Sequence, residues 1–416
     1  MKNTSLSINA LIYFVSNLIN ALVPFVLLPV LTRYLPPEEY GHVALFTIFS
    51  ACAVAVISFG VGGAVTRQYY HLEKPEFSEF VGTSILLVGF AVSVFMLIVF
   101  MAMSAFPDYR PLPLSWVLLA ILSAGGLSIY NIWLAFLQVS VKPLQYGVFQ
   151  ISQTALNVVV SLALVMGFSM GGLGRVLGQL SALIIFAVIA VWFFWQSGWL
   201  KFTLKGTHLR WLLGFGLPIV PHALSGIIIS MSDRLVLSHI SGAAALGVYA
   251  VAVQVSMIMT MLVDSFNKAY VPWLYARLAL DDEGVRRKLV LMTYVYFIAV
   301  LSLAVALGVI VPPLVGFFTG EKYAGAGEYQ LWLFLAGGFT GMYYMVGLYI
   351  NYSAKNKYLS WASGAAAVFT PLICYYLITI NGAVGAAQGA LAGQILLFLL
   401  VWIFSMRAYP MPWLHK

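Results

Sequence analysis

An aspartate and an arginine stand side by side in an otherwise apolar stretch, "GLPIVPHALSGIIISMSDRLVLSH", which runs from Gly216 to His239. A charge at the centre of a membrane costs about 2.5 kcal/mol or more, so Asp233 and Arg234 need partners there. Adjacent residues on a helix point about 100° apart, so the two have different partners. Arginine offers a planar fork of donors that suits phosphate, and aspartate can exchange a proton or Na⁺. The two residues could serve such chemistry, or they could only pair with neighbouring side chains.

Polar side chains recur at helical spacing in several other apolar runs, for example at i, i+4, i+7 and i+11 in the first and fifth runs. In lipid such groups must face protein or water. The stripes either bond helix to helix or line a shared hydrated cavity, and their spread over the whole chain favours the cavity. The residues that we assign to its polar lining are Asn9, Asn20, Asn131, Gln150, Asn157, Asn267 and Asn351.

Five basic residues lie near the ends of apolar runs or within them. Each by itself could reach an interface by extending its long side chain. Together they would place cations at both mouths of the cavity, which would suit an anionic substrate. The predicted substrate-binding cations are Arg33, Arg67, Arg175, Arg234 and Lys268, and the candidates for coupling or switching are Asp233, Asp264 and His222.

Proline pairs interrupt the first and the seventh apolar runs. Each proline removes a backbone hydrogen bond and bends its helix. Bent helices at matching places in two repeats point to a transport site, although a kink without a role stays open. The four hinge candidates are Pro24, Pro29, Pro218 and Pro221.

The elements that must position these residues are membrane-spanning helices. Of 416 residues, 62% are hydrophobic and 8% are charged, whereas soluble domains carry about 25% charged residues. At about 20 residues per span, we predict an all-α integral membrane protein with twelve helices. The predicted spans are 8–32, 41–66, 81–104, 115–139, 145–168, 174–196, 211–237, 243–267, 289–316, 328–353, 358–380 and 382–405.

Lysine and arginine are unevenly distributed over the connections between these spans. Sixteen lie on one side and five on the other, and the side that is richer in basic residues is the cytoplasmic one. Both termini are therefore predicted to lie in the cytoplasm. The same bias accounts for most of the net charge of +8, so the charge gives no reason to expect nucleic acid.

The two halves of the chain resemble each other in three places. The matching pairs are "PEEYGHVALF" (37–46) with "AAALGVYAVA" (243–252) at an offset of 206, "KPLQY" (142–146) with "KNKYL" (355–359) at an offset near 213, and "GRVLGQ" (174–179) with "GALAGQ" (389–394) at an offset of 215. Six spans per copy is an even number, so both copies point the same way. The predicted domains are an N-terminal lobe, 1–196, a cytoplasmic linker, 197–210, and a C-terminal lobe, 211–416.

Several kinds of chemistry have no motif in the chain. There is no GxxxxGK[ST] phosphate-binding loop, no His/Cys/Asp cluster with metal-ligand spacing and no pair of carboxylates placed as acid and base. His222 and His239 are isolated, which favours a structural role. Only two cysteines are present, both in apolar runs, so no disulfide framework is implied. We therefore expect neither an enzyme nor a bound cofactor.

Four stretches carry a resemblance to a known family. They are "NALVPFVLLPVLTRYLPPEEYG" (20–41), "GGAVTRQYY" (62–70), "GLPIVPHALSGIIISMSDR" (216–234) and "ALGVYAVAVQV" (245–255). With them the chain resembles the polysaccharide-transporter branch of the multidrug/oligosaccharidyl-lipid/polysaccharide (MOP) exporter superfamily, and within it the bacterial O-antigen flippases. The resemblance covers the whole length.

The resemblance implies a V-shaped pair of six-helix lobes in the bacterial inner membrane. It also implies alternating-access transfer of undecaprenyl-pyrophosphate-linked oligosaccharide from the cytoplasmic to the periplasmic leaflet, with possible H⁺ or Na⁺ coupling. Membrane lipids, a polysaccharide polymerase and a chain-length regulator would be the partners. The family's cationic cavity implies that matching residues of this chain line it. By motif these are Arg33, Arg67 and the Asp233–Arg234 pair.

Two other classes of protein stay open. A multidrug or small-solute antiporter of the same superfamily would favour an acidic cavity, whereas the charges near the spans here are mostly basic. A membrane polymerase or ligase of glycan assembly would need a sizeable outer loop with catalytic charges, and the predicted outer loops are short.

Overall fold

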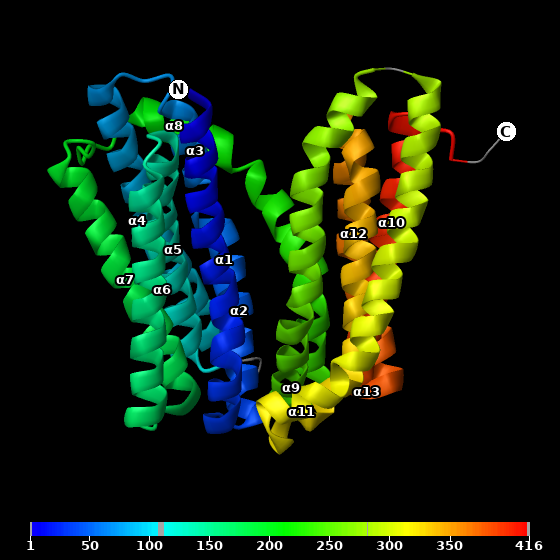
Figure 1. The fold of residues 1–416 in the computed structure, drawn as a ribbon. Coiled ribbons are helices and arrows are strands. Elements are labelled where there is room, and N and C mark those ends of the chain that lie inside the picture. The colour runs from blue at the N-terminus through cyan, green and yellow to red at the C-terminus, as the bar shows by residue number, and fades with distance from the viewer. Residues whose placement is uncertain (1, 107–111, 281, 414–416) are drawn as a thin grey trace. The chain divides into compact units, whose positions relative to one another are not determined.

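The computed structural model describes residues 2–106, 112–280 and 282–413, with side chains from residue 12 onward. All regular structure in these ranges is helical (Figure 1), which confirms the predicted all-α class. The first helices are α1 (Lys2–Tyr34), α2 (Pro37–Ile57), α3 (Val61–Gln68), α4 (Lys74–Ala105), α5 (Leu114–Val139), α6 (Pro143–Leu162) with a π turn (Ala163–Gly167), α7 (Gly171–Gln196) and α8 (Gly206–Gly216). The later ones are α9 (Ile219–Leu278), α10 (Glu283–Ile310), α11 (Pro312–Thr319), the 3₁₀ segment η3 (Glu321–Tyr329), α12 (Gln330–Tyr352) and α13 (Lys357–Ala408).

Ten helices in the described ranges are long and apolar enough to cross a membrane. Two of them contain a break at a glycine with positive φ, Gly242 in α9 (φ 81°) and Gly382 in α13 (φ 59°). Glycine adopts such a conformation without the steric cost that other residues meet. Each break separates two segments of spanning length, so the ten helices supply the twelve predicted spans. The chain is therefore a multi-pass membrane protein.

The second predicted span, 41–66, is in fact two helices. α2 ends at Ile57 and α3 begins at Val61, and between them Phe59 (φ 45°) and Gly60 (φ 63°) are left-handed. A Cβ on Gly216, at the end of α8, would lie 2.3 Å from the carbonyl oxygen of Phe59. The turn therefore fits closely against α8, and hydropathy alone could not reveal this break because the run stays apolar throughout.

The described residues form two compact units. The first comprises Met1–Leu35 and His42–Leu224, and the second comprises Pro36–Gly41 and Ser225–Lys416. The first turns of α9 thus belong with the first unit, and the first turn of α2 belongs with the second. The boundaries of these compact units differ from those of the lobes that we predicted at 1–196 and 211–416. The lobes were inferred from the sequence repeat and stay a prediction.

One of the repeated motifs makes the same contact in both halves. In "GRVLGQ", a Cβ on Gly178 would lie 2.3 Å from the hydroxyl of Ser161 on α6. In "GALAGQ", a Cβ on Gly393 would lie 2.6 Å from the side chain of Thr370 on the first segment of α13. Small residues let membrane helices approach closely. The sixth and twelfth spans therefore each pack on the preceding span through glycine.

A second repeated motif brings the two halves of the sequence into contact within the second unit. A Cβ on Gly41 would lie 1.9 Å from the carbonyl oxygen of Ala243, and one on Gly247 would lie 1.8 Å from that of Pro37. Beside this crossing, the hydroxyl of Tyr40 donates to Gln254 Oε1 at 2.8 Å. We call Gly41, Gly247 and the two facing carbonyls the glycine crossing. Only glycine at both positions permits this backbone approach.

The prolines singled out by the sequence lie in two different settings. Pro24 and Pro29 are inside α1, which stays helical around them. Pro218 lies in the turn between α8 and α9, and Pro221 is in the first turn of α9, where a missing N–H removes no helical bond. Pro218 and Pro221 therefore lie at a break between two helices rather than at a bend within one. The hinge role of all four prolines stays a prediction.

The C-terminal segment folds back on the second unit. The hydroxyl of Tyr294 on α10 donates to the backbone oxygen of Trp413 at 2.6 Å, and Lys355 Nζ donates to the backbone oxygen of Ala408 at 2.8 Å. The Trp413 ring also contacts that of Trp402, with 5.6 Å between ring centroids. Such aromatic pairs are worth about 0.5–1.5 kcal/mol each, so residues 409–413 are part of the folded unit.

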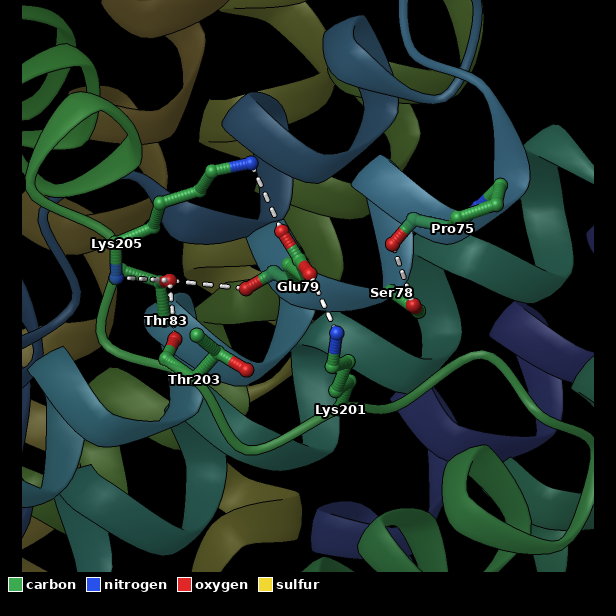
Figure 2. Close-up of polar contacts among 7 residues, drawn as sticks. All are labelled: Pro75, Ser78, Glu79, Thr83, Lys201, Thr203 and Lys205. Atoms are coloured by element: carbon green, nitrogen blue, oxygen red, sulfur yellow. Dashed lines mark hydrogen bonds and ion pairs between the residues drawn. The ribbon is translucent and has the colours of Figure 1, made fainter.

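The predicted linker, 197–210, is bound firmly to the first unit. Figure 2 shows that Lys201 and Lys205 both form ion pairs with Glu79 of α4, at 2.7 and 2.9 Å. The backbone is held as well, because Thr83 donates to the backbone oxygen of Thr203 at 2.8 Å. Hydrogen bonding to Glu79 raises the pKa of Lys205. A raised lysine pKa keeps the charge through neutral pH, so this stabilisation is lost only in alkali as the pH rises through that pKa.

We expect the backbone contact to stabilise the linker more than the ion pairs do. Glu79→Gln should lower the free energy of unfolding only slightly, because ion pairs with exposed lysines contribute little. Thr83→Val should lower it by about 1–3 kcal/mol, because a carbonyl loses its buried donor. Thermal unfolding in detergent and limited proteolysis of residues 197–205 would measure both. A larger effect for Glu79→Gln would contradict this ranking, and Glu76→Gln on the same helix is the matched control.

Candidate functional site

Asp233 lies in a buried hydrogen-bonded site in the second unit. Its side chain is 5% exposed, and its Oδ2 accepts a hydrogen bond of 2.6 Å from the hydroxyl of the fully buried Tyr249. Its Oδ1 accepts one of 2.8 Å from the backbone N–H of Arg234. The two partners lie on the two segments of α9, which meet because the chain turns at Gly242.

Two further side chains complete the surroundings of Asp233. Cys374 of α13 is fully buried and lies within electrostatic range of the carboxylate. The ring of Tyr329 packs edge-on against that of Tyr249, with 5.5 Å between centroids. Within the described residues, no charged side chain forms an ion pair with Asp233. Asp233 is therefore a buried carboxylate that neutral donors hold.

Arg234 does not form an ion pair with Asp233 within the described residues, as the 100° separation on a helix predicts. Its Nε is buried and has no hydrogen-bond partner. A buried donor that is left unsatisfied costs about 1–3 kcal/mol. The guanidinium thus has unused capacity to donate to an anion. We call Asp233, Arg234, Tyr249 and Cys374 the Asp233 site.

The structure places Arg175 in a polar cluster of the first unit. One terminal nitrogen donates to Asn157 Oδ1 at 2.6 Å and to Ser161 Oγ at 2.8 Å, and Ser161 also donates to Asn157 at 3.1 Å. The cluster joins α6 to α7 where α6 ends in its π turn. These contacts give Arg175 a structural role between two helices, and its predicted role in substrate binding stays a prediction.

The polar stripes of α1 and α6 face each other. Gln150 donates to Asn17 Oδ1 at 3.2 Å, and Thr154 donates to Asn20 Oδ1. This part of the predicted cavity lining therefore also bonds one helix to another, as the alternative interpretation of the stripes expected. Asn9 lies outside the residues whose side chains are described, so its role stays a prediction.

Two predicted site residues of opposite charge in the second unit form a pair. Lys268 Nζ lies 2.6 Å from Asp264 Oδ2, one helical turn apart on α9. Both side chains are well exposed, so the pair contributes only about 0.3–0.5 kcal/mol. Beside it, the Oδ1 atom of Asn267 is buried without a hydrogen-bond partner. The predicted binding cation and coupling carboxylate thus neutralise each other here.

The remaining predicted site residues are exposed. The guanidinium of Arg67, in the last turn of α3, lies 5.8 Å from the ring centroid of Trp211. The other members of this group are Arg33, Asn131, His222 and Asn351. Exposed polar side chains on spanning helices must face water or protein rather than lipid. The structure brings none of them into the Asp233 site.

Sequence reasoning missed two members of the Asp233 site. Tyr249 and Cys374 lie 16 and 141 positions beyond Asp233 in the sequence. Tyr249 could have been found from the glycine turn, because Gly242 lies midway between two spans and brings facing positions together. Cys374 has no such signal. No group of three or more potential metal ligands occurs in the ranges that the structure describes.

Comparison with known proteins gives the family. The model of the polysaccharide biosynthesis protein family (Polysacc_synt) matches residues 6–276, well over half of the chain. The chain is 26% identical over 364 residues to "Lsg locus putative protein 1" of Haemophilus influenzae, covering 85% of this chain and 87% of that protein. It is 25% identical over 390 residues to an "Uncharacterized membrane protein" of the same organism, covering 90% and 93%.

Two solved structures have the same fold. The inward closed conformation of lipid II flippase MurJ superposes with a TM-score of 0.76 at 14% identity, covering 96% of this chain and 88% of that one. An inward-facing multidrug resistance MATE transporter of the MOP superfamily superposes with a TM-score of 0.67 at 15% identity, covering 93% and 94%. At this level of identity the likeness concerns the fold. With a family match over residues 6–276 and a MOP-type transporter fold, the chain belongs to the polysaccharide biosynthesis protein family.

Proposed function

We propose that this protein is a flippase that moves undecaprenyl-pyrophosphate-linked oligosaccharide, such as an O-antigen repeat unit, from the cytoplasmic to the periplasmic leaflet. Membership of the polysaccharide biosynthesis family carries the proposal. The fold shared with the lipid II flippase MurJ is consistent with it. The protein would lie in the bacterial inner membrane with both termini in the cytoplasm, as the distribution of lysine and arginine predicts.

We propose that the Asp233 site contributes to binding of the substrate's head group. Arg234 has an unsatisfied buried donor, and the planar fork of an arginine guanidinium suits the phosphate oxygens of a carrier-lipid pyrophosphate. Arg33 and Arg67 are exposed and would add positive charge along the path of the substrate. We propose that Arg234 binds the anionic head group of the substrate in one state of the transport cycle.

We further propose that Asp233 couples the cycle to H⁺ or Na⁺. A buried carboxylate held only by neutral donors and one nearby arginine can change its charge with little rearrangement of its neighbours. Tyr249 joins the two segments of α9 through its hydrogen bond to Asp233. Gain or loss of the charge on Asp233 would change the strength of that bond. Ligand-driven switching requires such a difference in interaction between the two states. Asp264 and His222 are secondary candidates, because one is already paired with Lys268 and the other is exposed.

Deleting the gene tests the proposed function directly. The lipid-linked oligosaccharide should accumulate on the cytoplasmic leaflet, surface polysaccharide should fall, and a plasmid copy should restore both. Accessibility of the oligosaccharide to a membrane-impermeant lectin, in intact and in lysed spheroplasts, reports the leaflet. Normal surface polysaccharide in a strain without a second flippase would overturn the proposal. Altered resistance to organic cations in place of that phenotype would favour a multidrug antiporter, the function of the MATE transporters that share the fold.

A further inference from the structure

A groove in the first unit opens between α6 and α7 and has a volume of about 720 Å³. Its apolar walls come from both helices, at Leu144, Val148, Phe149, Phe186, Ile189 and Phe193. Two of these residues are strongly exposed, Leu144 at 67% and Val148 at 58%. On a membrane-spanning helix an exposed apolar side chain faces lipid. The groove therefore opens to the bilayer, and a hydrocarbon chain is the natural occupant.

The groove is polar at one end. Gln145 of α6 and Gln196 and Ser197 at the end of α7 lie there, together with Lys142 in the turn before α6. Lys142 is the one charged residue among the described residues that line the groove, and it forms no ion pair within the described part of the chain. Its Nζ lies 5.9 Å from the ring centroid of Phe136, which holds it near the interface.

This arrangement, an apolar groove with a cation at one end, has the polarity of an acyl chain attached to an anionic head group. We propose that the groove binds an anionic glycerophospholipid, with an acyl chain between α6 and α7 and its phosphate at Lys142. A cation with no carboxylate in the lining selects a net anionic head group over a zwitterionic one, because an amine would find no partner. Lys74 lies at the same end, since its Nζ donates to the backbone oxygen of Ser197 at 3.5 Å, and it adds positive charge beside the lysine that lines the groove. With the topology proposed above, the site faces the cytoplasmic leaflet, where basic residues bind anionic head groups.

The lysine at the matching place in the second half of the sequence makes a different contact. Lys355 occupies the position that matches Lys142 in the repeat, yet its Nζ donates to the backbone oxygen of Ala408 at 2.8 Å. The second copy thus uses its lysine to hold the end of α13. Nearby, Lys357 lies over the ring of Tyr358 at 5.5 Å and does not line a groove that is described. Lys357 is therefore a matched control, since it is an interfacial lysine over an aromatic ring.

The experiment compares phosphatidylglycerol with phosphatidylcholine of the same acyl chains, bound to the purified full-length protein and counted by native mass spectrometry. Lys142→Gln should reduce the preference for phosphatidylglycerol about fivefold, the effect of one lysine near an anionic surface. Lys357→Gln should leave the preference unchanged. Ser152→Trp, which fills the groove and keeps Lys142, should remove one tightly bound molecule of either lipid. Thermal unfolding confirms that each variant is folded.

Three results would overturn the proposal. A folded Lys142→Gln protein with the wild-type preference would show that this lysine does not select the lipid. An equal loss in Lys357→Gln would assign the preference to surface charge in general. Displacement of phosphatidylglycerol by equimolar undecaprenyl diphosphate would make the groove a subsite for the transported lipid. Should Lys142→Gln fail to fold, the lipid count of Ser152→Trp decides the matter alone. None of these results bears on whether the protein is a flippase, which the deletion strain tests.

Discussion

Asp233→Asn should abolish most of the transport and leave the protein folded. The carboxylate accepts from Tyr249 and from the backbone N–H of Arg234. An amide has only one acceptor oxygen, so when it keeps the bond from the backbone N–H of Arg234 its NH₂ group faces Tyr249, whose hydroxyl must then accept instead of donate. Hydrogen bonds to charged groups contribute about 1.5–3 kcal/mol, so we expect export to fall by about tenfold or more. Surface polysaccharide in a deletion strain complemented with the variant measures this loss.

Tyr249→Phe is the control that separates charge from structure. It removes the hydrogen bond between residues 249 and 233 and keeps the carboxylate. If Asp233 works through its charge, export should fall much less in Tyr249→Phe than in Asp233→Asn, at a comparable loss of thermal stability. If both variants lose export in step with the amount of folded protein, Asp233 has only a structural role. The comparison therefore tests the proposed coupling independently of the identity of the ion.

Gly247→Ala should cause the largest loss of stability of any single methyl addition discussed here. Its Cβ would lie 1.8 Å from the backbone oxygen of Pro37 and 3.0 Å from the backbone nitrogen of Gly41. Both are backbone atoms that cannot rotate away, so two helices must separate. Overpacking typically costs about 1–3 kcal/mol, occasionally more, and we expect a value at the upper end of that range.

The control for this variant is Gly364→Ala in α13. A Cβ on Gly364 would meet no atom within 4 Å, so the same change in helix propensity is made without the clash. Thermal unfolding of the purified proteins and their yield from membranes would show the difference. Equal stability of the two variants would mean that the glycine crossing is not a close contact in the membrane.

The spans could be predicted from the sequence because hydropathy reports directly on the lipid environment. All twelve predicted runs coincide with helical segments, and the turns at Gly242 and Gly382 lie where two apolar runs meet. Local breaks inside an apolar run were beyond this approach. The turn at Phe59 and Gly60 leaves the hydropathy unchanged, so only backbone geometry reveals it.

The candidate site could be predicted only in part. Asp233 and Arg234 stand out because charge is rare in the spans, and their separate partners follow from helical geometry. The neighbours of Asp233, Tyr249 and Cys374, could not be predicted, because a tyrosine or a cysteine in an apolar run is ordinary composition. The role of Arg175 also needed the structure, since its bonds to Asn157 and Ser161 depend on how α6 and α7 pack. Sequence identifies which residues need partners, and packing determines which partners they have.

The glycine crossing has a consequence for the descent of the chain. Gly41 and Gly247 are equivalent positions at the repeat offset of 206, as are Pro37 and Ala243. Gly41 faces Ala243, and Gly247 faces Pro37, so the two halves contribute equivalent residues to the contact. Such a self-complementary contact is typical of an interface between two copies of one chain. An ancestor with six spans that paired with itself would have needed a single glycine here to serve both sides. After gene duplication and fusion the same contact requires two glycines, each encoded separately. A side chain at either position would disrupt the contact even if the other stayed glycine.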